Sequence, residues 1–221
     1  MTQTEISIAT KQTLEQVALI PVLRARSLDE GHALVDAMMA GGVTVVEVTM
    51  TVPNAVDLLH KLKKLYGSSL LLGSGTVTDA AQAQATIEAG AEFVVSPSLH
   101  PDVIAKTKDL GKVSIPGALT PTEVLTAWRA GADYVKVFPC SAMGGASYLK
   151  ALRAPFPDIR LIPTGGVTLQ TAADFLKAGA VALGVGSDLV NPAAIAEGHP
   201  ESITKTARAY LDIIQTTRAA R

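Results

Sequence analysis

The chain has 221 residues, of which 48% are hydrophobic, and its formal charge is −1 at pH 7. This composition is typical of a globular protein with a sizeable core, and the balanced charge gives no electrostatic reason to expect nucleic acid or a membrane as a partner. The single cysteine excludes an internal disulfide, residues 1–16 lack the pattern of a signal peptide, and no stretch is long and apolar enough to span a membrane, so we expect a cytoplasmic protein.

The predicted elements begin with a helical extension at about residues 10–17. Eight short apolar runs then alternate with helical segments, the last of which runs from about residue 201 to 219. The runs cover residues 18–24, 43–50, 69–77, 92–98, 112–119, 133–140, 159–167 and 181–190. Phrases such as "AGGVTVVEV" and "AGADYVKVF" repeat, in which glycine ends a helix and a β-branched strand follows at once.

Strands that are apolar almost throughout indicate a parallel sheet that is buried on both faces. Eight strand–helix units predict an α/β fold of the (β/α)₈ TIM barrel type, as a single domain over residues 1–221. An open doubly wound sheet is the alternative. That fold needs fewer strands and a glycine fingerprint after the first one, and "VLRARS" is not such a fingerprint.

The sixth run, "DYVKVFPC", contains Lys136, and a buried lysine is costly unless it is paired or has a chemical task. Side chains alternate along a strand, which turns Lys136 and Glu47 of the second run into the barrel, near the mouth where active sites of this fold lie. A structural ion pair is one interpretation, although such pairs rarely stabilise more than apolar packing does. The other is that the desolvated amine forms a Schiff base with a ketone while the carboxylate moves protons.

Two glycine-rich segments end the last two predicted strands, "PTGGV" and "GVGSDLV". Loops after strands seven and eight of a barrel are the usual site for phosphate, although glycines can also serve only tight turns. Arg24 ends the first run and suits a bidentate contact with a carboxylate; the alternative is a solvated arginine, as we expect for Arg26. Thr76 is suited to donate to the same carboxylate or to make a local turn bond.

Seven motifs in order then identify a resemblance that runs from about residue 18 to 190. They are "VVEVTMTVP", "GSGTVTDAAQ", "FVVSPSLHPDV", "IPGALTPTE", "YVKVFPCSAMGG", "PTGGV" and "GVGSDLV". With these motifs the chain closely resembles the 2-keto-3-deoxy-6-phosphogluconate (KDPG) aldolases, which are grouped with the 4-hydroxy-2-oxoglutarate (KHG) aldolases.

The resemblance implies a role for each matching residue. Lys136 matches the Schiff-base lysine and Glu47 the proton-transfer glutamate. The residues implied to bind substrate are Arg24, Thr76, Pro97, Phe138, Gly165, Gly166, Gly186 and Ser187, the last four as the phosphate loops. One branch of the family has a carboxylate-binding arginine where this chain has Thr51, so the carboxylate is assigned to Arg24, as in another branch. The resemblance also implies a homotrimer without a metal or other cofactor.

The expected activity is therefore cleavage of KDPG to pyruvate and glyceraldehyde 3-phosphate, with KHG as a further candidate substrate. The motifs do not fix the configuration at C4, so the galactonate-derived epimer remains an alternative substrate. Two other functions stay open at this point. One is an isomerase or synthase of the phosphate-binding barrels that forms no imine, and the other is a metabolite-binding barrel without catalysis.

Overall fold

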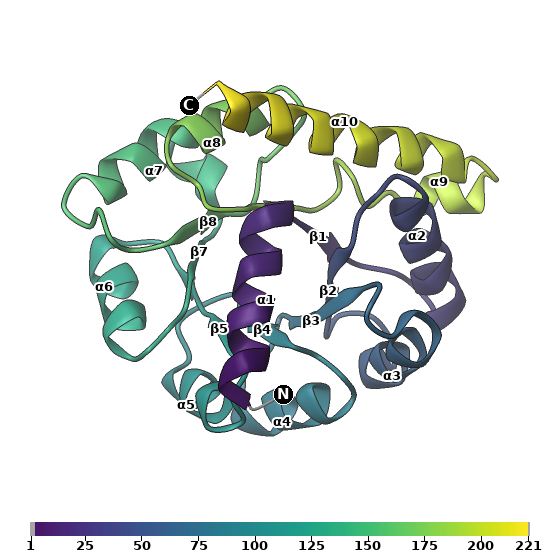
Figure 1. Cartoon of the computed structure of the whole chain (residues 1–221), viewed down its shortest axis with the longest axis horizontal. Coiled ribbons are helices and arrows are strands. Elements are labelled where there is room, and N and C mark those ends of the chain that lie inside the picture. Colours follow the sequence, from purple (N-terminus) through teal and green to yellow (C-terminus); the bar gives the residue numbers. More distant parts are fainter. Residues whose placement is uncertain (1–2, 221) are drawn as a thin grey trace.

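The computed structural model describes residues 3–220, in which short parallel strands are ringed by helices (Figure 1). Residues 1, 2 and 221 of the predicted domain lie outside this part. The strands are β1 (Leu19–Leu23), β2 (Val45–Thr49), β3 (Leu71–Gly75), β4 (Phe93–Val95), β5 (Val113–Ile115), β6 (Gly117–Ala118), β7 (Val135–Val137), β8 (Leu161–Pro163) and β9 (Leu183–Val185). Each predicted run contains a strand, and the fifth contains two.

The helices follow the strands in the predicted alternation. They are α1 (Gln3–Val17), α2 (Leu28–Ala40), α3 (Ala55–Tyr66), α4 (Ala80–Glu88), α5 (Pro101–Asp109), α6 (Pro121–Arg129), α7 (Ala146–Arg153), α8 (Ala172–Lys177), α9 (Pro192–Ala196) and α10 (Pro200–Ala219), with a 3₁₀ helix η1 (Cys140–Met143). The last helix agrees with the prediction to within one residue at its start.

The strands pair in parallel and form two ladders, ordered β5-β4-β3-β2-β1-β9 and β6-β7-β8. Pro116 separates β5 from β6, since proline has no N–H to give to a ladder. At the other junction, β8 and β9 meet through an isolated bridge between Thr164 and Gly184. The predicted single α/β domain with a parallel sheet is confirmed, but the hydrogen bonds within residues 3–220 do not form one continuous eight-stranded ladder.

The first and last strands are neighbours, which excludes the doubly wound alternative. Val22 of β1 pairs with Glu47 of β2, and Ile20 of β1 pairs with Gly184 of β9. The sheet is therefore curled and its neighbours follow chain order, whereas a doubly wound sheet reverses its order at a switch point. All five residues of β1 and of β2 are buried, as the apolar runs predicted.

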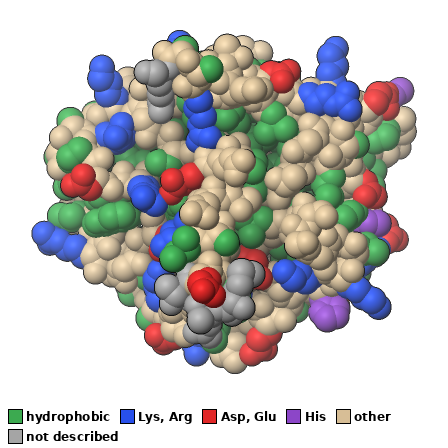
Figure 2. Space-filling view, in the orientation of Figure 1, with side chains coloured by type: hydrophobic (Ala, Val, Ile, Leu, Met, Phe, Trp, Pro, Cys, Tyr) green, Lys and Arg blue, Asp and Glu red, His purple; other side chains and the backbone are tan. Residues whose placement is uncertain are grey.

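Helix α1 lies across the strand assembly in front of the ring in Figure 1. The predicted segment at about 10–17 is thus only the second half of a helix that begins at Gln3. Its Thr10 and Leu14 are buried, so the helix packs on the body of the domain. On the face that carries α1, acidic and basic side chains are interspersed (Figure 2).

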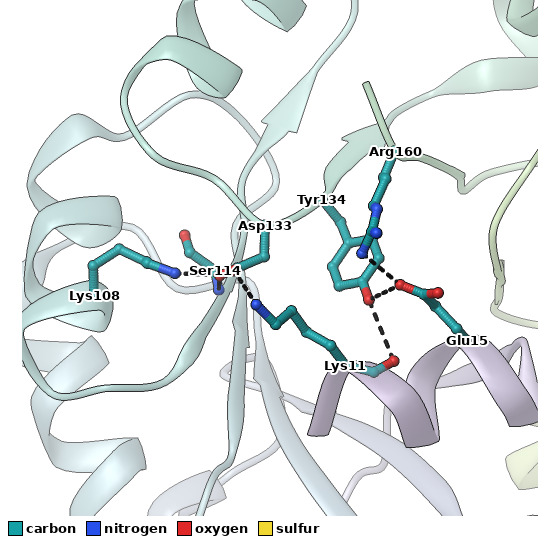
Figure 3. Close-up of polar contacts among 7 residues, drawn as sticks. All are labelled: Lys11, Glu15, Lys108, Ser114, Asp133, Tyr134 and Arg160. Carbon is teal, nitrogen blue, oxygen red and sulfur yellow. Dashed lines mark hydrogen bonds and ion pairs between the residues drawn. The ribbon is translucent and has the colours of Figure 1, made fainter. Parts of the chain in front are cut away.

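Polar contacts tie α1 to the starts of two strands (Figure 3). The Tyr134 hydroxyl donates to the Glu15 carboxylate at 2.7 Å, and Arg160 pairs with the same carboxylate at 2.6 Å. Lys11 pairs with Asp133 at 3.4 Å. Because Asp133 and Tyr134 precede β7 and Arg160 precedes β8, α1 covers the amino-terminal end of the strands. The carboxyl-terminal end, where barrel enzymes place their chemistry, lies on the other side.

Candidate active site

Lys136 and Glu47 meet in the interior between the two ladders. Glu47 is the middle residue of β2, and Lys136 is the middle residue of β7. Their side chains are 7% (Lys136) and 3% (Glu47) exposed, and Lys136 Nζ lies 3.8 Å from Glu47 Oε1. The alternation of side chains predicted that both would turn inward, and the structure brings them together.

The Glu47 carboxyl is desolvated and only partly compensated. Its Oε1 has no hydrogen-bond partner among the described residues, because the 3.8 Å contact with Lys136 is too long. Burial raises the pKa of Glu47 above its usual range, and the positive charges of Lys136 and Arg24 oppose that shift. A buried acceptor without a partner costs about 1–3 kcal/mol. Such groups are typical of catalytic sites, where a proton must be accepted or held.

Two neighbours complete the surroundings of this pair. The Phe138 ring centroid lies 5.2 Å from Lys136 Nζ, within cation–π range. Gly75 at the end of β3 approaches Glu47 so closely that a Cβ there would lie 2.0 Å from Glu47 Oε1. Sequence reasoning missed Gly75, although its signal, the phrase "GSG" before Thr76, was among the quoted motifs. We infer that glycine is required here to leave room for the carboxylate.

Thr76 follows β3 with a left-handed backbone, at φ 58°. This conformation is unfavourable for a β-branched residue, by about 1–3 kcal/mol, and strain of this kind concentrates at functional sites. A local turn bond was the alternative role predicted for the Thr76 hydroxyl. Within residues 3–220 the hydroxyl makes no such bond. Pro97 follows β4 and lies against Gly117 of β6, where a Cβ would come within 2.5 Å of the Pro97 carbonyl oxygen.

A cavity of about 620 Å³ opens beside Phe138, between the loops that follow β8 and β9. Six predicted site residues line it: Arg24, Phe138, Gly165, Gly166, Gly186 and Ser187. Thr164, Thr168 and Asp188 also line the cavity and were not predicted. Asp188 lies inside the quoted motif "GVGSDLV", but its type gave no signal, since a carboxylate is not expected in an anion site.

The two glycine loops present free backbone donors. Gly165 and Gly166 have left-handed backbones, at φ 85° and 76°, which glycine adopts without strain. In the described part of the chain, no acceptor pairs with the backbone N–H of Gly165, Gly166, Gly186 or Ser187. Unpaired N–H groups gathered at one cavity can bind the oxygens of an anion.

The two arginines after β1 differ in their engagement. Arg26 donates to Glu30 at 3.0 and 2.5 Å, on the surface, as its predicted solvated position implied. No hydrogen bond or ion pair within residues 3–220 engages the Arg24 guanidinium, which lines the cavity. Arg24 is therefore the one of the two that is available to a ligand.

No group of three or more His, Cys, Asp or Glu residues within 3–220 is placed to hold a metal ion. None of the helices described is long and apolar enough to cross a membrane. Cys140 is buried, and burial raises the pKa of its thiol to about 11, so it is a poor nucleophile at neutral pH.

The chain is similar in sequence and structure to proteins of one known family. The model of the KDPG and KHG aldolase family matches residues 10–206. The 2-dehydro-3-deoxy-6-phosphogalactonate aldolase of Escherichia coli is 34% identical over 90% of this chain and 98% of its own. The 2-dehydro-3-deoxy-phosphogluconate aldolase of Treponema pallidum is 34% identical over 92% and 96%. The structure of the KDPG aldolase of Legionella pneumophila, with pyruvate captured as a covalent carbinolamine, is similar with a TM-score of 0.83 at 28% identity, over 95% and 98% of the chains.

Proposed function

The chain belongs to the KDPG and KHG aldolase family, which makes it a lyase, and on that premise we propose that it cleaves KDPG to pyruvate and glyceraldehyde 3-phosphate through a Schiff base on Lys136. The observation that carries the proposal is the buried pair of Lys136 and Glu47, 3.8 Å apart, next to a cavity with free anion donors.

The proposed reaction begins when the unprotonated Lys136 amine attacks the C2 ketone of the substrate. The resulting carbinolamine loses water, with Glu47 moving the protons, and leaves an iminium. Glu47 then accepts the proton of the C4 hydroxyl, the C3–C4 bond breaks, and its electron pair moves to the iminium nitrogen. Glyceraldehyde 3-phosphate leaves, the enamine is protonated at C3, and hydrolysis releases pyruvate and the free amine.

The rest of the proposed site holds the two ends of the substrate. The phosphate is bound by the N–H groups of Gly165, Gly166, Gly186 and Ser187, which support this role because no acceptor among residues 3–220 pairs with them. The carboxylate is bound by the free guanidinium of Arg24 and the hydroxyl of Thr76. Phe138 and Pro97 provide the apolar wall around the pyruvate portion.

We extend the proposal to the closure of the sheet and to the assembly. The interruption at Pro116 and the bridge from Thr164 to Gly184 support a closed arrangement of eight strand–helix units, in which β5 and β6 act as one strand. The family resemblance supports a homotrimer in the cytoplasm. Sedimentation at three times the chain mass of 22.9 kDa supports the trimer, and a monomer contradicts it.

The substrate is tested by pyruvate release from KDPG, from the galactonate epimer and from KHG in parallel. We expect the first to be cleaved, whereas a preference for the epimer would assign the chain to the activity named for its Escherichia coli relative. Lys136→Ala should abolish cleavage, and Glu47→Gln should slow it by about 10²–10⁴-fold. Binding of all three without pyruvate release contradicts catalysis, and full activity of Lys136→Ala contradicts the imine.

A further inference from the structure

Asp188 connects three separate segments around the cavity. Its Oδ2 accepts the backbone N–H of Leu169, in the loop after β8, at 3.2 Å. The same oxygen accepts a short hydrogen bond from the hydroxyl of Tyr210 in α10. Asp188 itself lies in the loop after β9, directly after Ser187. One carboxylate oxygen therefore joins both glycine loops to the last helix.

The position of Tyr210 is fixed by burial and by a second hydrogen bond. It is completely buried, and its hydroxyl also lies 3.4 Å from the carbonyl oxygen of Val167, again in the loop after β8. Burial first, and then the bond to Asp188, raise the pKa of Tyr210 far above its usual range, so the hydroxyl remains a donor at any working pH. Helix α10 packs against α2 and α8, so Tyr210 lies on an element that is held against the body of the domain.

The charge of Asp188 acts against the ligand that the cavity is built for. Asp188 lines the cavity together with the phosphate-loop glycines, and a carboxylate there repels a phosphate group. Its hydrogen bonds have the opposite effect. They hold the two glycine loops in place before the phosphate binds. A loop that is already ordered loses less backbone freedom on binding, so it binds more tightly.

We propose that Asp188 and Tyr210 are positioning residues that hold the two glycine loops in the arrangement that binds the substrate phosphate. The inference rests on the proposed function of this site. It predicts that breaking the contact weakens phosphate recognition, whereas a role of Asp188 through its charge alone predicts that removing the charge strengthens it.

The test compares two reactions of the full chain. Cleavage of KDPG, the phosphorylated substrate, needs the loops, whereas exchange of pyruvate methyl protons for deuterium in D₂O needs only the imine and proton transfer. Tyr210→Phe should lower kcat/KM for KDPG by about tenfold, mainly through KM, because one charge-assisted hydrogen bond is lost. The exchange rate should fall much less. Tyr66→Phe is the matched control, since it removes a Tyr–Asp hydrogen bond to Asp36 on the outer helices.

Two substitutions of Asp188 separate position from charge. Asp188→Asn keeps an oxygen that can accept from Leu169 and Tyr210, so its kcat/KM for KDPG should be clearly higher than that of Asp188→Ala. Asp188→Ala should lower it as Tyr210→Phe does. An increase in both Asp188 variants, or no loss in Tyr210→Phe beyond that of Tyr66→Phe, would overturn the inference. A wild-type protein that exchanges no pyruvate protons would instead overturn the proposed function, and the positioning inference with it.

Discussion

Glu47 is a carboxylate whose environment favours the protonated form, and this has a consequence for stability. Because its pKa in the folded chain is raised above the ordinary 4.5, the folded chain holds a proton that the unfolded chain has lost, over the range from about 4.5 up to the raised value. The free energy of unfolding therefore falls as pH rises through this range.

The amide in Glu47→Gln cannot ionise, so this variant should lose the pH-dependent contribution of Glu47 to the free energy of unfolding. We expect the variant to become more stable relative to the wild type as pH rises from 4.5 towards neutrality, because only the wild type has to ionise a buried carboxyl group at position 47. Urea unfolding of both proteins at several pH values measures the difference. A difference that does not change with pH contradicts the raised pKa.

Gly75 provides a second test at single-residue scale. In Gly75→Ala the new Cβ meets Glu47 Oε1 at 2.0 Å, so the carboxylate must move. We expect kcat to fall by about 10²-fold, because a misplacement of about 1 Å can cost this much. Gly67→Ala is the control: Gly67 has a positive φ, unlike Gly75, but nothing lies within 4 Å of its Cβ position, so this variant measures backbone strain without a close contact. Equal losses in both variants would mean that general destabilisation is the cause.

At the scale of elements, a substitution in α1 should change the stability of the fold without changing catalysis. Glu15 accepts from buried Tyr134 and pairs with Arg160, at the end of the strands opposite to the proposed chemistry. Glu15→Ala should lower the free energy of unfolding by about 1–3 kcal/mol, because the Tyr134 hydroxyl loses its close acceptor. The value of kcat/KM should not change.

Glu88→Ala is the matched control for this prediction. Glu88 is exposed on α4 and, within residues 3–220, accepts a hydrogen bond only from Gln84, so its loss should change stability by less than about 0.5 kcal/mol. Urea unfolding and KDPG cleavage are measured on both variants. A loss of activity in Glu15→Ala at temperatures where the protein is folded would contradict the separation.

The elements also show how far the sequence predicts this fold. Strand alternation was enough to direct Lys136 and Glu47 inward, because each strand is buried and its register is fixed by its apolar neighbours. The first half of α1 was not predicted, because residues 5–9 are exposed or only half-buried and show no apolar pattern. The contacts with Asp133 and Arg160 come from Lys11 and Glu15, in the half that was predicted. The division of the fifth predicted strand into β5 and β6 was not predicted either. Pro116 has no N–H to donate, and whether this interrupts a strand depends on the neighbouring strands in the folded sheet.

At the scale of the whole molecule, the two ends of the strand assembly have separate tasks. Helix α1 covers the amino-terminal end through polar contacts, while the glycine loops that follow β8 and β9 line the cavity at the other end. The sequence predicted the types of most site residues at this end. It missed Gly75 and Asp188, because a close approach and a contact between loops depend on the folded arrangement rather than on a motif.

The most direct test of the account is the trapping of pyruvate by borohydride, followed by intact mass and peptide mapping. We predict one reduced pyruvyl adduct per chain on Lys136 and none in Lys136→Ala. Folded wild-type protein without an adduct, or with the adduct on another lysine, would contradict the central claim and leave Lys136 and Glu47 as a structural ion pair.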